Sequence, residues 1–100
     1  MKYTVYITDP AQEELDAAYI WLVAQTPQHG PLWHNGLLDA IISLESNPAR
    51  CPIAPGSEAG PVGTRQLLYG SKQHAYRILF MIREDRVIVL HIIHGARDAR

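Results

Sequence analysis

The last ten residues, HIIHGARDAR (91–100), hold two histidines, a glycine and two arginines. Imidazole groups exchange protons near neutral pH, and guanidinium groups bind carboxylate and phosphate. His91 and His94 are three positions apart on an expected strand, where they face opposite sides, so they do not form a metal-chelating pair. This ending is therefore either a charged tail or a functional rim at the end of a sheet.

Other catalytic and cofactor motifs are missing from the sequence. It has no GxGxxG or P-loop pattern. Its four serines lack a nucleophile-elbow context: Ser43, Ser46, Ser57 and Ser71. Cys51 is the only cysteine, which excludes an intrachain disulfide and a cysteine-rich metal site. We therefore expect no metal and no cofactor.

Charge is divided unevenly along the chain, although the net charge is only −1. Residues 1–49 hold one lysine against six acidic residues, whereas residues 50–100 hold eight basic against four acidic residues. This asymmetry favours an acidic partner for the second half, although the alternative is that the two halves neutralise each other. The small net charge argues against simple coating of nucleic acid.

The N-terminus has no long apolar run and no small-residue cleavage site, and the apolar stretches are shorter than a membrane span. We therefore expect a cytoplasmic protein without a membrane partner. A length of 100 residues predicts a single domain over residues 1–100.

Hydrophobic periodicity predicts a strand and two helices in the first half. Residues 2–8 alternate in the manner of a strand, and Asp9-Pro10 then opens a helix with Asp9 as its cap. Leu15, Ala18, Tyr19, Leu22 and Val23 form the apolar face of that helix. A break at residues 26–31 precedes a second helix at about residues 32–46, which predicts an antiparallel helical hairpin.

The second half predicts a loop followed by strands. Residues 47–64 are rich in proline and glycine and form a surface connection. Strands follow at residues 64–69, 75–82 and 86–94, the last two joined by a tight polar turn. The order β-α-α-β-β-β predicts an α+β domain in which the N-terminal strand and the helical hairpin accompany a mainly antiparallel sheet.

Both faces of the last hairpin are apolar. If Glu84 and Asp85 form its turn, one face carries Tyr76, Ile78, Phe80, Ile82, Val87, Val89, His91 and Ile93. The other face carries Arg77, Leu79, Met81, Ile88, Leu90, Ile92 and His94. We expect the helices to cover the Phe80 face, which leaves the Arg77 face as a groove for a partner peptide. Alternatively, each helix covers one face and no groove remains.

Motifs spread over nearly the whole chain resemble the ParE/RelE superfamily of type II toxins. They are Asp9-Pro10-Ala11, Tyr19-Ile20, Asn47-Pro48, Arg65-Gln66-Leu67, Tyr76-Arg77-Ile78-Leu79-Phe80 and the ending His91–Asp98. The fold of that superfamily, a helical hairpin on an antiparallel sheet, agrees with the fold expected from periodicity.

The resemblance implies a plasmid-stabilisation toxin that a cognate antitoxin neutralises by wrapping around it. RelE-like members cut mRNA on the ribosome, and ParE-like members poison DNA gyrase. The sequence lacks the C-terminal tyrosine tail of many RelE-like members, and its Gly-Ala-Arg-Asp ending is similar to ParE, so gyrase is the preferred target. The alternatives are a ribosome-dependent mRNA endonuclease, which would make the chain an enzyme, and a non-toxic regulator that only binds antitoxin.

The resemblance and the residue pattern together give three sets of candidates. The candidates for catalysis are Arg77, Arg97, His94 and Arg65, with His74 a further source of acid or base. The expected antitoxin-binding residues are Leu79, Met81, Leu90, Ile92 and Arg77, and the expected target-binding residues are Arg97, Lys72 and Arg65. Gly95 is expected to form a bend that aims Arg97. A homodimer or a hetero-oligomer with the antitoxin is the expected assembly.

Overall fold

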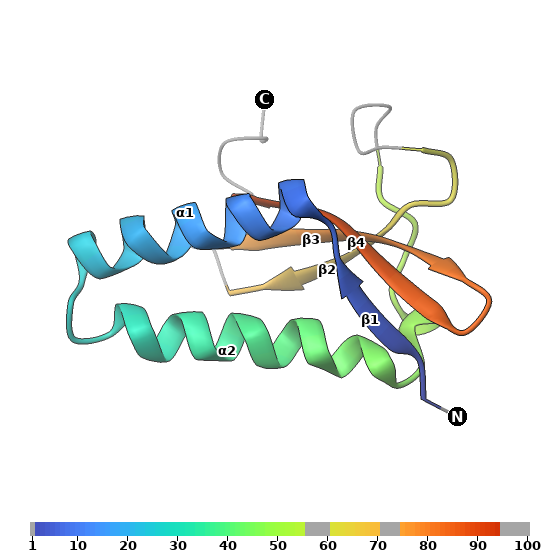
Figure 1. The fold of residues 1–100 in the computed structure, drawn as a ribbon, viewed down its shortest axis with the longest axis horizontal. Helices are drawn as coiled ribbons and strands as arrows, with labels where there is room; N and C mark the ends of the chain where they lie inside the picture. Colours follow the sequence, from blue (N-terminus) through green and yellow to red (C-terminus); the bar gives the residue numbers. More distant parts are fainter. Residues whose placement is uncertain (1, 56–60, 71–74, 95–100) are drawn as a thin grey trace.

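The computed structural model describes residues 2–55, 61–70 and 75–94, and its elements follow the predicted order (Figure 1). The first half contains β1 (Thr4–Ile7), α1 (Asp9–Gln25) and α2 (Gly30–Ile42), and two short 3-10 turns follow. The second half contains β2 (Arg65–Tyr69), β3 (Tyr76–Arg83) and β4 (Arg86–His94). The strands form one sheet in the order β1-β4-β3-β2, in which only β1 and β4 are parallel. The predicted α+β fold is confirmed.

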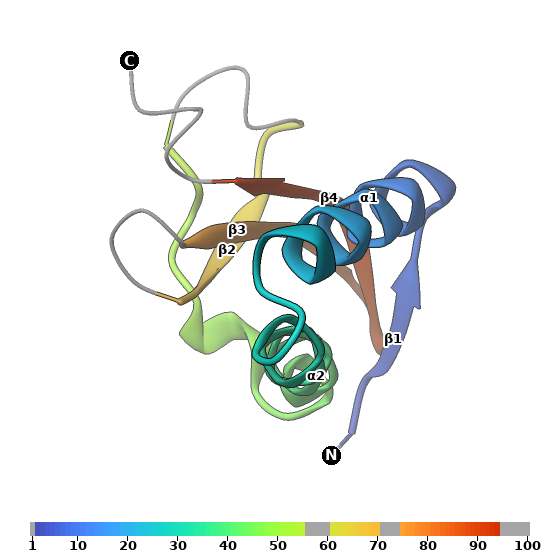
Figure 2. The ribbon, with the colours of Figure 1, turned by 90° about the vertical axis from the view of Figure 1, so that its left-hand side faces the viewer.

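Both helices pack on the same face of the sheet, as Figure 2 shows along the helical hairpin. The core joins buried residues of α1 and α2 to the side of the strands that carries Phe80. Its main members are Ala11, Leu15, Ala18, Leu37, Ile41, Leu44, Tyr76, Ile78, Phe80, Val87, Val89 and Ile92. The alternative in which each helix covers one face of the sheet is therefore wrong.

The start of α1 differs from the prediction in its capping residue. Thr8, not Asp9, is the N-cap, and its Oγ1 accepts a hydrogen bond from the Ala11 amide at 3.4 Å. Threonine suits this position because its hydroxyl satisfies an amide that the helix leaves without a partner. Tyr19, predicted on the apolar face, is 40% exposed, and Ala11 takes part in the buried face instead.

The hairpin between β3 and β4 confirms the predicted turn, because Arg83 pairs with Arg86. Between Phe80 and Leu79 the register shifts, so that Phe80 pairs with Val89 but Leu79 pairs with His91. Leu90 is thus an extra residue in β4, a β-bulge. Since alternate strand residues face opposite sides, the extra residue exchanges the two faces for the rest of the strand.

The face assignment predicted beyond the bulge is therefore wrong. Ile92 pairs with Ile78, and His94 pairs with Tyr76, so both lie on the helix-covered face and not with Met81. Conversely, His91 pairs with Leu79 and Ile93 pairs with Arg77, so both lie on the outer face and not with Phe80. The prediction failed because it assumed an unbroken ladder from Arg83 and Arg86 to the end of β4.

Within the described part of the chain, neither helix is long and apolar enough to cross a membrane.

Candidate functional site

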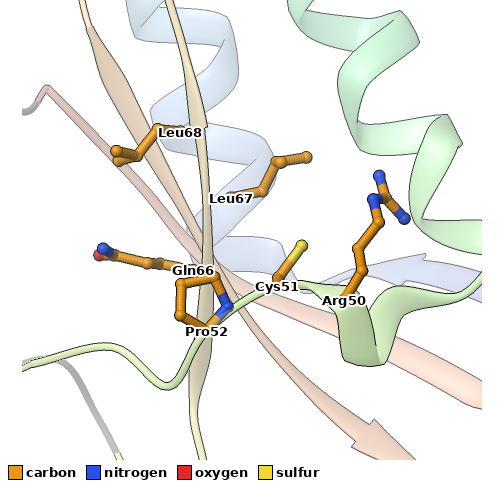
Figure 3. Close-up of a pocket in the computed structure, with 6 residues that line it drawn as sticks. All are labelled: Arg50, Cys51, Pro52, Gln66, Leu67 and Leu68. Atoms are coloured by element: carbon orange, nitrogen blue, oxygen red, sulfur yellow. The ribbon is translucent and has the colours of Figure 1, made fainter.

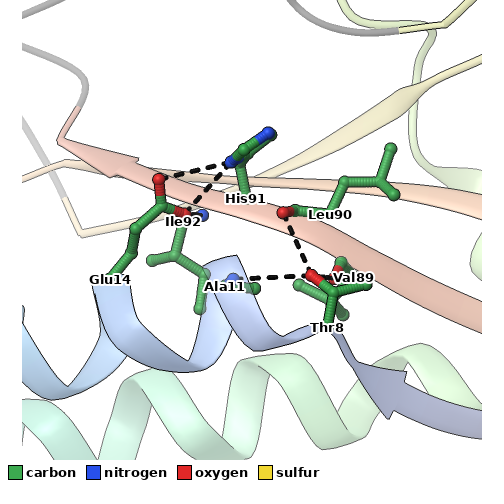
Figure 4. Close-up of polar contacts among 7 residues, drawn as sticks. All are labelled: Thr8, Ala11, Glu14, Val89, Leu90, His91 and Ile92. Atoms are coloured by element: carbon green, nitrogen blue, oxygen red, sulfur yellow. Dashed lines mark hydrogen bonds and ion pairs between the residues drawn. The ribbon is translucent and has the colours of Figure 1, made fainter.

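The second half of β4 forms an edge of the sheet that side chains close. β1 ends at Ile7, which pairs with Val89, so beyond that point no described strand lies beside β4 on the side away from β3. The Thr8 amide donates to the Val89 carbonyl at 3.1 Å. The Thr8 hydroxyl lies 2.8 Å from the Val89 carbonyl and 3.2 Å from the Leu90 carbonyl (Figure 4). One residue therefore caps α1 and covers carbonyl groups at this edge.

Glu14 covers the next part of the same edge. One oxygen of its carboxylate accepts the Ile92 amide at 2.8 Å, and the His91 Nδ1 lies 3.2–3.3 Å from both oxygens (Figure 4). A hydrogen bond from an amide to a carboxylate is stronger than one to a neutral acceptor. Glu14 thus takes the place that a neighbouring strand would occupy and ties the first half of α1 to the end of β4.

His94 lies among aromatic rings at the end of β4. Its ring centre is 4.9 Å from that of Tyr76 and 6.4 Å from that of Trp21, both in edge-on arrangements. Trp33 contacts Tyr76 and Tyr69 in the same region. The Nδ1 of His94 is buried and has no hydrogen-bond partner within the described residues. This histidine is packed as an aromatic side chain.

The two described candidate arginines face opposite sides of the sheet. Arg77 pairs with Leu68 on the face away from the helices, and its Nε donates to Gln66 Oε1 at 3.0 Å. Arg65 pairs with Phe80, whose side chain lies in the core, and its Nη1 donates to the Cys51 carbonyl at 2.6 Å. Arg65 therefore ties the start of β2 to the preceding loop, which gives it a structural role that the sequence did not predict.

The candidate catalytic residues are thus not gathered in one place within the described part of the chain. His94 and Arg65 belong to the helix-covered face and Arg77 to the outer face. Arg97, Lys72, His74 and Gly95 lie outside the described residues. No group of three metal-binding side chains occurs among the residues that the structure describes.

Two of the expected antitoxin-binding residues are buried in the structure. Ile92 is 3% exposed and belongs to the core, and Leu79 is fully buried, so neither is accessible to a partner in this structure. Met81 and Leu90 keep partial exposure. Strand alternation places two further apolar side chains on the outer face, Tyr6 at 51% exposure and Leu68 at 59%. Sequence reasoning missed both.

A pocket of about 450 Å³ lies beside β2 at the opposite edge of the sheet (Figure 3). Its lining residues are Arg50, Cys51, Pro52, Gln66, Leu67 and Leu68. Burial raises the pKa of the Cys51 thiol, and the neighbouring charges of Arg50 and Arg65 partly oppose that rise. Arg50 also donates to the Ser46 carbonyl at 2.6 Å, so it stabilises the turn after α2 as well as lining the pocket.

The helical hairpin holds one further perturbed group. The His34 ring lies edge-on to Tyr19, with centres 4.6 Å apart, and desolvation lowers the pKa of His34 while the charge of Asp16 partly opposes that change. This histidine is distant in the fold from the edges of the sheet and belongs to helix packing.

A signal for Thr8 and Glu14 did exist in the sequence, since threonine before Asp-Pro is a preferred helix cap and Glu14 follows within two turns.

Comparisons with known proteins assign the chain to a family. The sequence profile of the family described as "ParE toxin of type II toxin-antitoxin system, parDE" matches residues 5–99. No curated protein sequence matches the chain significantly.

Solved structures with the same fold include the chromosomal ParDE toxin–antitoxin system from P. aeruginosa, with a TM-score of 0.73 and 17% identity over 93% of this chain and 96% of that one. They also include the toxin–antitoxin complex RelBE2 from Mycobacterium tuberculosis, with a TM-score of 0.60 and 21% identity over 94% of this chain and 99% of that one. At such identities these likenesses show the shared fold. Because the family profile spans almost the entire sequence, the chain belongs to the ParE toxin family of type II toxin–antitoxin systems.

Proposed function

We propose that this chain inhibits growth by acting on DNA gyrase and that a cognate antitoxin neutralises it. Membership of the ParE family supports a ParE-like target. The observation that carries the proposal is the separation of Arg77 from His94 on opposite faces of the sheet.

That separation disfavours RNA cleavage by the described residues. Cleavage without a metal needs a proton donor or acceptor and a cation at the same phosphate. The sheet stands between His94, the described histidine among the predicted catalytic residues, and the cation of Arg77. His91 lies on the Arg77 face, but its Nδ1 is 3.2–3.3 Å from the Glu14 carboxylate, which engages it at the edge of the sheet. The Arg65 guanidinium, on the same face as His94, is committed to the Cys51 carbonyl. A protein that acts by binding gyrase needs a complementary surface, but it does not need an acid or base group beside a cation.

For the antitoxin, we propose the face of the sheet away from the helices as the contact surface. Its accessible apolar side chains include Tyr6, Met81, Ile88, Leu90, Ile93 and Leu68. Burial of these side chains would supply affinity at roughly 25 cal/mol per Å² of apolar surface. Acidic antitoxin residues would pair with Arg77 and the other basic residues of the second half. Arg97 and Lys72 remain proposed contacts to the target.

A paired assay tests the choice of target. Purified chain is added to gyrase with supercoiled plasmid and, separately, to translating ribosomes with a reporter mRNA. We expect lost supercoiling and trapped double-strand breaks in the first assay and intact mRNA in the second. Cleaved mRNA with unaffected gyrase would establish the endonuclease alternative, and no effect in either assay, together with normal growth on expression, would favour the regulator.

The Arg97→Ala variant tests the terminal contact. We expect it to lose inhibition of gyrase while it keeps antitoxin binding, because the proposed antitoxin surface lies on the strands. Co-purification with the antitoxin serves as the control for folding. Full inhibition by Arg97→Ala would mean that the ending is a charged tail.

A further inference from the structure

The outer side of β1 carries backbone groups that no described residue binds. The Thr4 amide donates to the Asp85 carbonyl at 2.9 Å, and the Thr8 amide donates to a carbonyl of β4 at 3.1 Å, so both amides turn toward the β4 side. Successive residues of a strand direct their N–H and C=O groups to opposite sides. The backbone groups of Val5 and Ile7 therefore point away from β4, and β1 is the last strand of the sheet in that direction (Figure 1).

This open stretch is short and lacks the usual blocking devices. Exposed edges are commonly protected by a charged side chain, a proline or a bulge. The strand Thr4–Ile7 contains none of these, and its pairing with β4 is regular. The described cover ends at Tyr3, whose amide donates to the Glu45 carbonyl at 2.8 Å, and at Lys2, which forms a bridge with Ser46. The edge can therefore accept a partner strand no longer than the stretch from residue 4 to residue 8.

A second copy of the same stretch fits this edge in one register. When a two-fold axis passes through Tyr6, Val5 of each copy pairs with Ile7 of the other, and all the outward groups gain partners. An axis through Val5 would bring Ile7 of the copy to the place that Glu45 occupies. An axis through Ile7 would oppose Val5 to Asp9, which already belongs to α1.

The side chains of the stretch are compatible with the same register. Tyr6 is 51% exposed on the outer face and would lie opposite Tyr6 of the copy, where paired aromatic side chains add to the affinity. Lys2 at one end, whose amine also lies 3.3 Å from Glu45, would approach Asp9 of the copy, which is exposed at the other end. Opposite charges thus meet at both ends of the pair, and no charge lies between them.

We propose that two copies of this chain pair through β1 and form a symmetric dimer with one continuous sheet. The axis is perpendicular to the sheet, so both helical hairpins lie on the same face. The contact is small, below the roughly 1,200 Å² that is typical of stable interfaces, so the dimer is weak and forms at high concentration. This pairing requires neither gyrase nor the antitoxin and therefore goes beyond the proposed function.

Disulfide cross-linking of the purified toxin tests the register. Both variants carry Cys51→Ala, which removes the native thiol. Tyr6→Cys places two thiols across the axis, where the Cβ atoms of such a pair lie roughly 4.5–5.5 Å apart. Thr4→Cys is the matched control, because it is exposed on the same face but would lie opposite Thr8 of the copy. We expect Tyr6→Cys to cross-link at least about tenfold faster under mild oxidation. Equal rates would overturn the proposed pairing.

Amide exchange and sedimentation of the wild-type toxin test the dimer without any new thiol. When about nine tenths of the chain is dimeric, exchange of the Val5 and Ile7 amides should slow about tenfold, whereas the Tyr6 amide, which faces β4, should not change. Tyr6→Lys brings two like charges together and should abolish the dimer. Leu68→Lys adds the same charge at the other edge of the sheet and should dimerise like wild type.

A chain that stays monomeric at roughly 1 mM would overturn the dimer. So would protection of the Val5 and Ile7 amides that appears only when purified antitoxin is added, because the edge would then belong to the antitoxin. Both outcomes leave the proposed action on gyrase untouched.

Discussion

The two edges of the sheet differ in how their backbone groups are paired. At the β4 edge, Thr8 and Glu14 satisfy backbone groups that have no neighbouring strand. At the β2 edge, the preceding loop stops at Gln66, and the backbone groups of Leu68 have no partner within the described residues. Proteins usually block exposed edges because these promote unwanted pairing. The described residues therefore close the β4 edge of the sheet and leave part of the β2 edge without a backbone partner among them.

The difference has a local cause in the order of the chain. β1 runs directly into α1, so the first two turns of that helix lie where they can reach β4. β2 follows a loop rich in proline, which has few amides to donate along an edge. Closure of the β4 edge therefore accompanies the fold, whereas the described part of the loop before β2 covers only the start of the opposite edge.

The largest expected effect distinguishes the two faces of β4 around the bulge. Ile92→Asp places a carboxylate in the core and should cost on the order of 3–5 kcal/mol of unfolding free energy, enough to unfold a small domain. Leu90→Asp and Met81→Asp put the charge on partly exposed positions and should leave a folded chain with weaker antitoxin binding. Circular dichroism during urea titration measures each cost. A folded Ile92→Asp variant would contradict the register shift.

A smaller effect is expected from the cap of α1. Thr8→Val keeps the shape of the side chain but removes the hydroxyl that serves both the Ala11 amide and the β4 carbonyls. We expect a loss of about 1–2 kcal/mol in unfolding free energy. The same change at the exposed Thr4 is the matched control and should alter stability by less than about 0.5 kcal/mol. Equal losses at the two positions would show that the hydroxyl does not close the edge.

Glu14 should contribute less, because its carboxylate is partly open to water. Glu14→Ala leaves the Ile92 amide without its acceptor and should lower the unfolding free energy by about 1 kcal/mol. Glu14→Gln keeps an acceptor and should recover part of that loss. Glu13→Ala, at an exposed neighbouring position, is the control. If the Glu13 and Glu14 variants unfold at the same urea concentration, the Glu14 carboxylate does not stabilise the β4 edge of the sheet.

The smallest expected effect is a change in the alkylation rate of Cys51, which lies beside β2. Because burial raises the pKa of Cys51, less thiolate is present near neutral pH, and iodoacetamide should alkylate the folded chain more slowly than the unfolded chain. Mass spectrometry over time measures both rates. Equal rates in the folded and unfolded chain would mean that burial does not protect the thiol.

The sequence alone predicted the features that depend on a single local pattern. The strand and helix order, the turn at Glu84 and Asp85, and the choice of the Phe80 face for the helices all follow from periodicity and turn chemistry. The parallel partner of β1 and the role of Arg65 did not follow, because they depend on contacts between distant segments. The bulge at Leu90 left no signal either, since an extra leucine in a uniformly apolar strand fits both registers.

The site was harder to predict for the same reason. Ile92 and Met81 seemed equivalent in an alternating pattern, and only the shifted register shows that one is core and the other surface. Glu14 and Thr8 could be recognised as helix-start residues, but their contacts with β4 span nearly eighty positions of the chain.

The parallel pairing of β1 with β4 also determines when the protein can fold during its synthesis. Thr4–Ile7 pairs with Arg86–Val89, and the apolar faces of both helices rest on strands made after residue 64. A ribosome adds roughly 5–20 residues per second, and 52 residues separate the end of α2 at Ile42 from the end of β4 at His94, so the helical hairpin waits about 3–10 s for the last strand. The toxin has no finished core before then. The last strand to be made is thus the one that joins the two ends of the chain and completes the core.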